Sequence, residues 1–285
     1  MKHAYQQPFE LTPAADAERF ESGAREYADY LRTVEGRLRL DLAWENFRSA
    51  FAENDPGPDA ATIRGALAPA LDLGCGTGAL AVRLAREGRR VCAADTSAAM
   101  LEIAAEAARR ERCDDRIDFY RLEAGRAAEV FDARSFGAVV CHNVLEYVSD
   151  PGAVARAAGR LLRPGGVASF LARNRAGEAL RDAVKLHDLD SAARALTADS
   201  VRESLYGGPA RLFDAESLNA LAVEAGLEIV AVRGVRVVAD YLPASLSETD
   251  ELYARLLAFE LRLGSNADFV PVARYVQMIA RAPAR

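Results

Sequence analysis

The chain has 285 residues, of which 51% are hydrophobic and 27% charged, and its formal net charge at pH 7 is −6. This composition is typical of a globular protein and excludes a disordered or fibrous one, while the negative charge excludes a chain-wide attraction to nucleic acid and leaves only a local basic surface for such contacts. No apolar run approaches the roughly 20 residues of a membrane span, and the N-terminus lacks a secretion signal, so we expect a cytoplasmic protein without membrane contact.

The first part of the chain, residues 1–64, is predicted to form a helical segment ahead of a main domain at 65–285. Apolar side chains recur at helical spacing through residues 20–31 and again through 38–51. The sequence Asn54-Asp55-Pro56-Gly57-Pro58 ends this pattern, because proline and glycine interrupt helices. We therefore place the boundary between the two parts near residue 64.

Strands and helices alternate between residues 65 and 172. We predict strands at 70–73, 90–94, 117–122, 137–141 and 167–172, and helices at 78–87, 97–110 and 151–162. The sequence Arg163-Pro164-Gly165-Gly166 predicts a turn before the fifth strand. Because the strands are short and apolar and helices separate them, the pattern indicates an α/β fold with a parallel, doubly wound sheet.

The alternation ends after residue 172. Residues 173–210 are polar and are predicted to form a mostly helical insertion after the fifth strand. A helix at 215–225 follows, and then strands near 227–238 and 273–282, separated by a helix near 249–263. These last elements are expected to complete the sheet of the main domain.

A glycine-rich turn follows the first strand of the main domain, in the sequence Leu71-Asp72-Leu73-Gly74-Cys75-Gly76-Thr77-Gly78. Glycine permits positive φ and a close approach of the backbone to a ligand, and the helix after the turn favours a negative group at its N-terminus. Asp95 ends the next strand, where an acid accepts hydrogen bonds from both ribose hydroxyls in such βαβ units. The turn and Asp95 together predict a cofactor that contains a nucleoside.

The choice of cofactor depends on Asp72. The pattern Gly74-x-Gly76-x-x-Ala79 also fits a dinucleotide fingerprint, so a nicotinamide cofactor is an alternative. A carboxylate this close to the turn would repel a pyrophosphate, whereas it suits a ligand with an ammonium and a sulfonium group. S-adenosylmethionine (SAM) carries both, and its carboxylate suits the backbone N–H groups of the turn, so we predict SAM.

Two further stretches resemble motifs of the class I SAM-dependent methyltransferases. Asp95-Thr96-Ser97-Ala98-Ala99-Met100-Leu101 resembles the second-strand signature of that superfamily, and residues 161–166 resemble its turn before strand five. The resemblance covers about residues 65–172 and implies a Rossmann-like sheet of seven strands, with the last strand antiparallel to the others. It implies that Met100 lies near the adenine. From the turn, its acid and the residue after Asp95, we predict that the cofactor also contacts Asp72, Gly74, Gly76, Gly78 and Thr96.

A narrower resemblance runs nearly from end to end. Residues 20–42, 141–151, 173–177, 234–242 and 269–283 are similar to the bacterial tRNA 5-carboxymethoxyuridine methyltransferase family. This family methylates the carboxylate of a modified wobble uridine and forms a methyl ester. The resemblance implies that tRNA is a partner and that SAM contacts Arg39, Gly74, Cys75, Asp95, Ala124, Gly125 and His142.

Such a reaction needs few chemical groups from the protein. Methyl transfer is an in-line displacement, so alignment of the reactants and exclusion of water are the main contributions. A carboxylate is already ionised at neutral pH, so we predict no catalytic base. Arg39 can fork onto the SAM carboxylate, which would make the N-terminal helices a lid over the cofactor. If the acceptor is a phenol or an amine, His142 or Glu146 is the candidate base.

Other interpretations stay open at this stage. Residues 186–204 carry more acidic than basic residues, so a small metabolite is the alternative acceptor, and a SAM-binding or nucleotide-binding protein without transferase activity is a third possibility. Basic residues that could follow tRNA phosphates, if they share a face, are Arg173, Arg175, Arg181, Lys185, Arg211, Arg233 and Arg236. Three histidines and four isolated cysteines predict no metal site.

Ordinary structural roles compete with these assignments. Asp95 can cap the helix that follows it, although Ser97 and Thr96 are better placed to do so. His142 can be a core histidine, and Arg39 can pair with an acid within helical reach. Glu35 and Asp41 are the candidate partners of Arg39. Cys75 and Cys141 can be packing residues, and Tyr206 and Tyr241 can be core rather than base-stacking residues.

Overall fold

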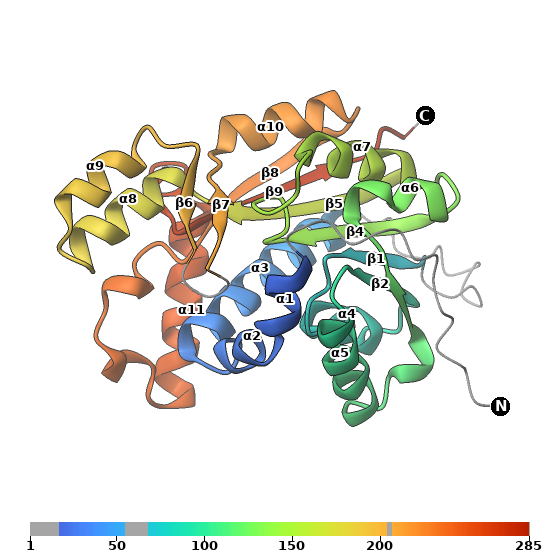
Figure 1. Cartoon of the computed structure of the whole chain (residues 1–285), viewed down its shortest axis with the longest axis horizontal. Coiled ribbons are helices and arrows are strands. Elements are labelled where there is room, and N and C mark those ends of the chain that lie inside the picture. Colours follow the sequence, from blue (N-terminus) through green and yellow to red (C-terminus); the bar gives the residue numbers. More distant parts are fainter. Residues whose placement is uncertain (1–16, 55–67, 204–206, 285) are drawn as a thin grey trace.

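The computed structural model describes residues 17–54, 68–203 and 207–284 (Figure 1). Residues 1–16 and 55–64 of the predicted N-terminal segment, and with them His3, lie outside the described residues, as does Tyr206. Within the described ranges, no helix combines the length and the apolar character that crossing a membrane would require.

A seven-stranded sheet forms the centre of the molecule, with the strand order β3-β2-β1-β4-β5-β9-β8 (Figure 1). Its strands are β1 (Ala70–Leu73), β2 (Val91–Asp95), β3 (Ile117–Arg121), β4 (Phe136–His142), β5 (Leu162–Arg173), β8 (Glu228–Val235) and β9 (Tyr275–Arg281). Neighbouring strands from β3 to β5 are parallel, whereas β9 is antiparallel to both β5 and β8. The predicted Rossmann-like sheet, with its antiparallel last strand, is confirmed.

Helices cover both faces of the sheet (Figure 1). One face carries α3 (Val34–Asn54), α4 (Ala79–Arg86) and α5 (Ala98–Arg110), with α11 (Asp250–Ser265) packed on α3, and the other carries α6 (Ala127–Val130), α7 (Pro151–Leu161) and α10 (Ala215–Glu224). In β1, Leu71 and Leu73 enter the core beside α7, whereas Ala70 enters the core beside α4. Since side chains alternate along a strand, Asp72 faces the same side as Ala70.

The fifth strand begins earlier than predicted. Leu162 of β5 pairs with Phe136 of β4, and the pairing then skips to Ala138 with Val167. Gly165 lies among the skipped residues and has a φ of +75°, a conformation that suits glycine. The segment predicted as a free turn is therefore an irregular start of β5, because the residues on both sides of it pair with β4.

The insertion after β5 is only partly helical. α8 (Arg175–Val184) and α9 (Leu189–Ala195) confirm the prediction for its first half. Two short antiparallel strands, β6 (Ser200–Arg202) and β7 (Pro209–Arg211), then form a hairpin that the sequence analysis did not predict. Strands of three residues are too short to show a periodic pattern, and they are stabilised here by pairing with each other and by burial of Ala210.

Candidate active site

A cavity of about 1300 Å³ opens at the carboxyl ends of the parallel strands. One part, which we call the turn half, is lined by Gly74, Gly76, Asp95, Thr96, Met100 and Ala124. The other part, the arginine half, is lined by Arg173, Arg236, Arg274 and Tyr275 and by residues of α8, α9 and the β6–β7 hairpin. Arg39 and His142 line this cavity and also a small one of about 40 Å³ beside the turn.

The predicted cofactor residues do not all reach the large cavity. Arg39, Gly74, Gly76, Asp95, Thr96, Met100, Ala124 and His142 line it, whereas Asp72 and Cys75 line the small cavity. Gly78 is the N-cap of α4, and a Cβ there would lie 2.8 Å from the Cβ of Ala104, so its absence lets α4 and α5 approach closely. Gly125 packs in the same way against Ala153, where an added Cβ would be 3.3 Å away.

Asp95 organises the glycine-rich turn. Its carboxylate accepts hydrogen bonds from the backbone N–H of Gly76 at 2.8 Å and from that of Ser97 at 3.0 Å. Burial raises the pKa of Asp95, although these N–H groups favour its charged form. Ser97, and not Asp95, is the N-cap of α5, because its hydroxyl accepts from the backbone N–H of Met100. Asp95 therefore stays at the cavity with its carboxylate held in place.

Asp72 is a buried acid with an unsatisfied oxygen. Its side chain is only 2% exposed, and Oδ2 has no hydrogen-bond partner. Burial, with a smaller effect of the nearby Asp95 charge, raises the pKa of Asp72 to about 7. A buried carboxylate without a partner is costly unless a proton or a cation satisfies it. Asp72 thus lies beside the turn as predicted, with capacity for a positive group.

Arg39 is a buried cation whose counterion the described residues do not supply. The residue is 7% exposed, and its Nη2 donates a hydrogen bond to the hydroxyl of Tyr27 at 2.9 Å. Its guanidinium lies over the rings of Tyr27, Tyr30 and Tyr275, with 5.1–5.7 Å to each centroid.

The acids proposed as structural partners of Arg39 are occupied elsewhere. Glu35 lies 3.9 Å from Lys185, and Asp41 pairs with Arg83 and accepts from the hydroxyl of Tyr253. No ion pair of Arg39 with a carboxylate occurs in the part of the chain that the structure describes. The interpretation of Arg39 as a salt-bridged surface residue is therefore wrong.

His142 ends β4, Glu146 follows this strand, and both line the cavity. Nε2 of His142 lies 2.8 Å from Oγ of Ser169, and burial, aided by the Arg39 charge, lowers the pKa of His142 to about 3. One carboxylate oxygen of Glu146 accepts from Asn143 and from the backbone N–H of Arg173, while its other oxygen has no partner. Burial raises the pKa of Glu146.

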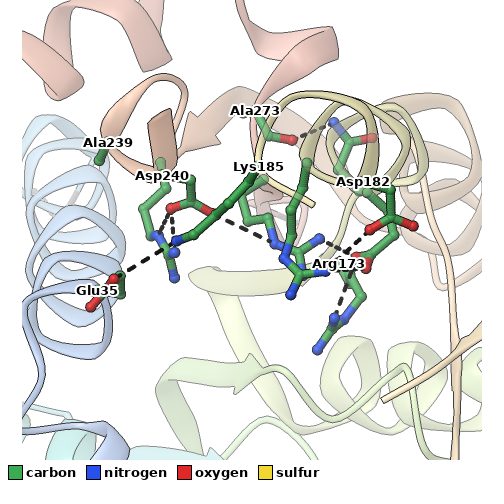
Figure 2. A network of polar contacts seen from close by, with 12 residues as sticks. Glu35, Arg173, Asp182, Lys185, Ala239, Asp240 and Ala273 are labelled. Carbon is green, nitrogen blue, oxygen red and sulfur yellow. Dashed lines mark hydrogen bonds and ion pairs between the residues drawn. The ribbon is translucent and has the colours of Figure 1, made fainter. Parts of the chain in front are cut away.

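Buried ion pairs build the arginine half, as Figure 2 shows from close by. Glu178 of α8 pairs with Arg173 at 3.3 Å and also with Arg274, and Arg236 pairs with Asp240. Burial opposes ionisation of Glu178, but the charges of Arg274 and Arg173 outweigh it and lower its pKa. These pairs attach the insertion to β5 and to the start of β9.

Arg173 and Arg236 are therefore not the phosphate-binding residues that the sequence suggested. Arg236 is buried, only 11% of the Arg173 side chain is exposed, and both are neutralised by acids of the same chain. Of the other basic candidates, Arg181, Lys185 and Arg211 line the cavity, whereas Arg175 and Arg233 do not, so the seven do not share one open face. The exposed basic residues at the cavity on the insertion also include Arg194 and Arg202.

Tyr275 is a residue of the site that sequence reasoning missed. It begins β9, pairs in register with Arg173 of β5 and lines the cavity. Burial alone would raise its pKa, but the charges of four arginines, Arg39 first, lower it to about 8. The sequence marks Tyr275 only by its position beside Arg274 at the start of a strand. The four arginines come from distant parts of the chain, so no local pattern shows them around one tyrosine.

The N-terminal helices α1 (Ala17–Ser22) and α2 (Ala24–Tyr30) join this site. Phe20, Tyr27 and Tyr30 line the cavity. Glu21 of α1 accepts hydrogen bonds from the hydroxyl of Ser97 and, at 2.9 Å, from the backbone N–H of Ala99, so it binds the N-terminus of α5 next to Asp95. Among the described residues, no group of histidine, cysteine and acidic side chains could hold a metal ion.

Comparisons with known proteins show which family this chain resembles. Residues 71–170 match the family model of a methyltransferase domain. The chain is 30% identical over 258 residues to the tRNA 5-carboxymethoxyuridine methyltransferase of Escherichia coli K12, covering 88% of this chain and 90% of that one. It is 36% identical over 115 residues to a ubiquinone biosynthesis O-methyltransferase of Xanthomonas oryzae pv. oryzae, covering 40% and 46% of the two chains.

The fold also matches solved structures. A SAM-dependent methyltransferase from Thermotoga maritima superposes with a TM-score of 0.55 over 93% of this chain and 99% of that one, at 18% identity. At this identity the likeness concerns the fold alone.

Proposed function

The chain belongs to the class I SAM-dependent methyltransferases, in the family that includes tRNA 5-carboxymethoxyuridine methyltransferase, and we propose that it methylates the carboxylate of 5-carboxymethoxyuridine at the wobble position of tRNA. The proposal is supported by a likeness that extends beyond the methyltransferase domain and covers 88% of this chain. The reaction would occur in the cytoplasm, where tRNA is modified, and its product is a methyl ester.

The unsatisfied charges of the site fit SAM. We propose that Arg39 binds the carboxylate of SAM and that Asp72 stabilises its ammonium group from the small cavity. Asp95 would bind the ribose, and the turn from Gly74 to Gly78, Thr96, Met100 and the segment at Ala124 would surround the nucleoside. When bound, SAM supplies a methyl group on a sulfonium. The single observation that carries this assignment is a buried cation and a buried acid, Arg39 and Asp72, neither of which has an oppositely charged partner among the described residues.

The protein's part in catalysis is to align and to exclude water. A carboxylate acceptor arrives ionised, so no residue needs to remove a proton from it. We propose that the arginine half receives this acceptor, with the hydroxyl of Tyr275 as a hydrogen-bond donor to it. The acids that neutralise Arg173, Arg236 and Arg274 keep these guanidinium groups in place.

The N-terminal helices α1–α3 contribute residues to one side of the cavity. Phe20, Tyr27 and Arg39 line the cavity from this side, and Glu21 attaches α1 to the N-terminus of α5. We propose that this segment covers the bound cofactor and that the Glu21 contact holds it closed, which keeps water from the reacting atoms.

Nucleoside analysis of tRNA tests the proposed substrate. In a strain that lacks the gene for this chain, mass spectrometry of digested tRNA is expected to show 5-carboxymethoxyuridine in place of its methyl ester. Expression of the wild-type chain restores the ester, whereas the Asp95→Ala variant does not. An unchanged nucleoside profile in a strain that makes 5-carboxymethoxyuridine would exclude this substrate.

A small phenolic metabolite is the second candidate acceptor. Glu146 favours it, because this buried acid lines the cavity with an unpartnered oxygen and a raised pKa, as a base for a phenol would. Partial likeness to ubiquinone biosynthesis O-methyltransferases also supports it. Under this alternative, Glu146→Gln abolishes methyl transfer to the phenol, whereas transfer to a carboxylate needs no such base.

A further inference from the structure

A buried line of hydrogen bonds connects α3 to His142 at the cavity. Gln277 of β9 and Ser169 of β5 are both 0% exposed. Nε2 of Gln277 donates to the backbone carbonyl of Ala43 at 2.9 Å and to Oγ of Ser169 at 3.0 Å. Oγ of Ser169 in turn lies 2.8 Å from Nε2 of His142. The line thus passes from the backbone of α3, through two strands, to a residue that lines the cavity.

The positions of the hydrogen atoms along this line follow from its fixed end. A backbone carbonyl can only accept, so the Gln277 amide must turn its NH₂ group toward Ala43. Asn46 agrees with this orientation, because its Nδ2 donates to Oε1 of Gln277 at 3.0 Å. The second hydrogen of the Gln277 NH₂ group then points to Ser169, whose oxygen accepts it.

Ser169 has one hydrogen left to donate. Among the described residues, its hydroxyl meets no other partner than Gln277 and His142, and Gln277 is already the donor. The hydroxyl hydrogen therefore points to Nε2 of His142, which must accept it. A neutral imidazole with one accepting nitrogen carries its hydrogen on the other nitrogen.

We infer that Ser169 and Gln277 are positioning residues that hold His142 as the neutral Nδ1–H tautomer and leave this N–H as a hydrogen-bond donor for the molecules that fill the cavity. Burial and the nearby charge of Arg39 act in the same direction, since both disfavour a charged imidazole. A ring in this state cannot remove a proton from an acceptor, because Nδ1 already carries a hydrogen and Nε2 accepts from Ser169.

This inference limits the chemistry of the acceptor. Of the two candidate bases, His142 is excluded and Glu146 alone is left. An Nδ1–H donor suits an acceptor that arrives as an anion with free oxygen lone pairs, such as a carboxylate, and this part of the inference rests on the proposed function. The tautomer itself does not, because it follows from contacts inside the protein.

Nitrogen NMR of the histidine side chains tests the tautomer directly. The chain has only three histidines, so a His3→Ala, His187→Asn double variant leaves His142 as the sole signal; asparagine suits the positive φ of residue 187. We expect a pyrrole-like Nδ1 and a pyridine-like Nε2, unchanged between pH 5 and 9. A pyrrole-like Nε2, a mixture of the two tautomers, or protonation of the ring in this pH range would overturn the inference.

A variant of the serine tests the positioning role. In the same background, Ser169→Ala is expected to remove the preference for the Nδ1–H tautomer, so that the Nε2–H form also appears. It should lower kcat/KM for methyl transfer roughly tenfold, as loss of one buried hydrogen bond does. Ser135→Ala is the matched control, because the hydroxyl of this exposed serine bonds a backbone carbonyl far from the cavity. An unchanged tautomer in folded Ser169→Ala protein would contradict the role.

The proposed function and the tautomer of His142 can be disproved separately. The tautomer is measured without any acceptor, so a purified enzyme that leaves tRNA unmethylated overturns the proposed function and not the inference. If Ser169→Ala does not fold, the measurement on the background with the natural Ser169 still decides the tautomer.

Discussion

The turn half and the arginine half of the cavity are built in different ways. The residues of the turn half lie between Gly74 and Ala124, and Asp95 organises them through backbone N–H groups. The arginine half joins β5, α8, the start of β9 and the turn after β8, and Glu178 and Arg274, which pair there, are 96 residues apart in the chain. A short motif is sufficient for the first half, whereas the second depends on the completed fold.

The two halves also differ in how their charges are balanced. Beside the turn, Asp72 and Arg39 are buried without an oppositely charged partner among the described residues, so the cost of burying their charges depends on the ligand. In the arginine half, Glu178, Glu203 and Asp240 neutralise the guanidinium groups around Tyr275. Buried ion pairs of this kind contribute little net stability but are costly to break. The turn half can thus bind a charged ligand, whereas the ion pairs of the arginine half fix the shape of that part of the cavity.

Loss of the Asp95 carboxylate is expected to have the largest effect. Asp95→Ala removes the acceptor for two ribose hydroxyls and releases the N–H of Gly76, which costs roughly 3–6 kcal/mol of SAM binding at 1.5–3 kcal/mol for each charged hydrogen bond. Isothermal titration calorimetry measures this loss. Asp118→Ala, an exposed acid on the neighbouring strand β3, is the matched control. Equal SAM affinity in the Asp95 variant and the wild type would refute the cofactor site.

Neutralising Glu178 is expected to destabilise the fold rather than to weaken cofactor binding. Glu178→Gln leaves Arg173 and Arg274 without their shared partner, and breaking a buried pair costs about 3–5 kcal/mol. Urea unfolding measures the change. Glu129→Gln, which breaks the exposed pair with Arg126, should leave the free energy of unfolding almost unchanged. Equal effects of the two variants would mean that the buried network has no structural role.

Asp72 should give the protein a pH-dependent stability. Its pKa of about 7 lies above the value of an unfolded aspartate near 3.9, so the folded protein binds the extra proton between these values and its stability falls as pH rises from 4 to 7. We expect the wild type to lose on the order of 2–4 kcal/mol more than Asp72→Asn across this range, as measured by urea unfolding. Parallel pH curves would show that Asp72 is ionised throughout.

Charge reversal at the cavity mouth should have the smallest effect. Arg194 and Arg202 line the cavity and are exposed on the insertion, whereas Arg173 lines it but is held in ion pairs. If each contacts a phosphate, changing both to Glu weakens tRNA binding several-fold and lowers the salt dependence of the affinity by about one charge per contact. Filter binding at several salt concentrations measures this. Arg109→Glu with Arg110→Glu on α5 is the control pair, and an equal loss in both would indicate unspecific attraction.

The two halves also differed in how much of each could be predicted from the sequence. The strands from Ala70 to Ala172, the turn at Gly74 and the position of Asp95 followed from local patterns, because consecutive residues build them. Arg173 was considered as a possible phosphate contact, and Tyr275 and Glu178 were not recognised, since their roles come from neighbours that only the tertiary fold supplies. The β6–β7 hairpin was missed for the same reason, as its strands are stabilised by each other.

Transfer of labelled methyl groups tests the central claim most directly. Purified protein is incubated with methyl-labelled SAM and tRNA that carries 5-carboxymethoxyuridine, and the labelled tRNA is then treated with mild alkali. The account predicts that label enters the tRNA and is released by alkali as methanol, because a methyl ester is hydrolysed under these conditions. Label that alkali does not release, or tRNA that stays unlabelled while a small phenol is methylated, would contradict it.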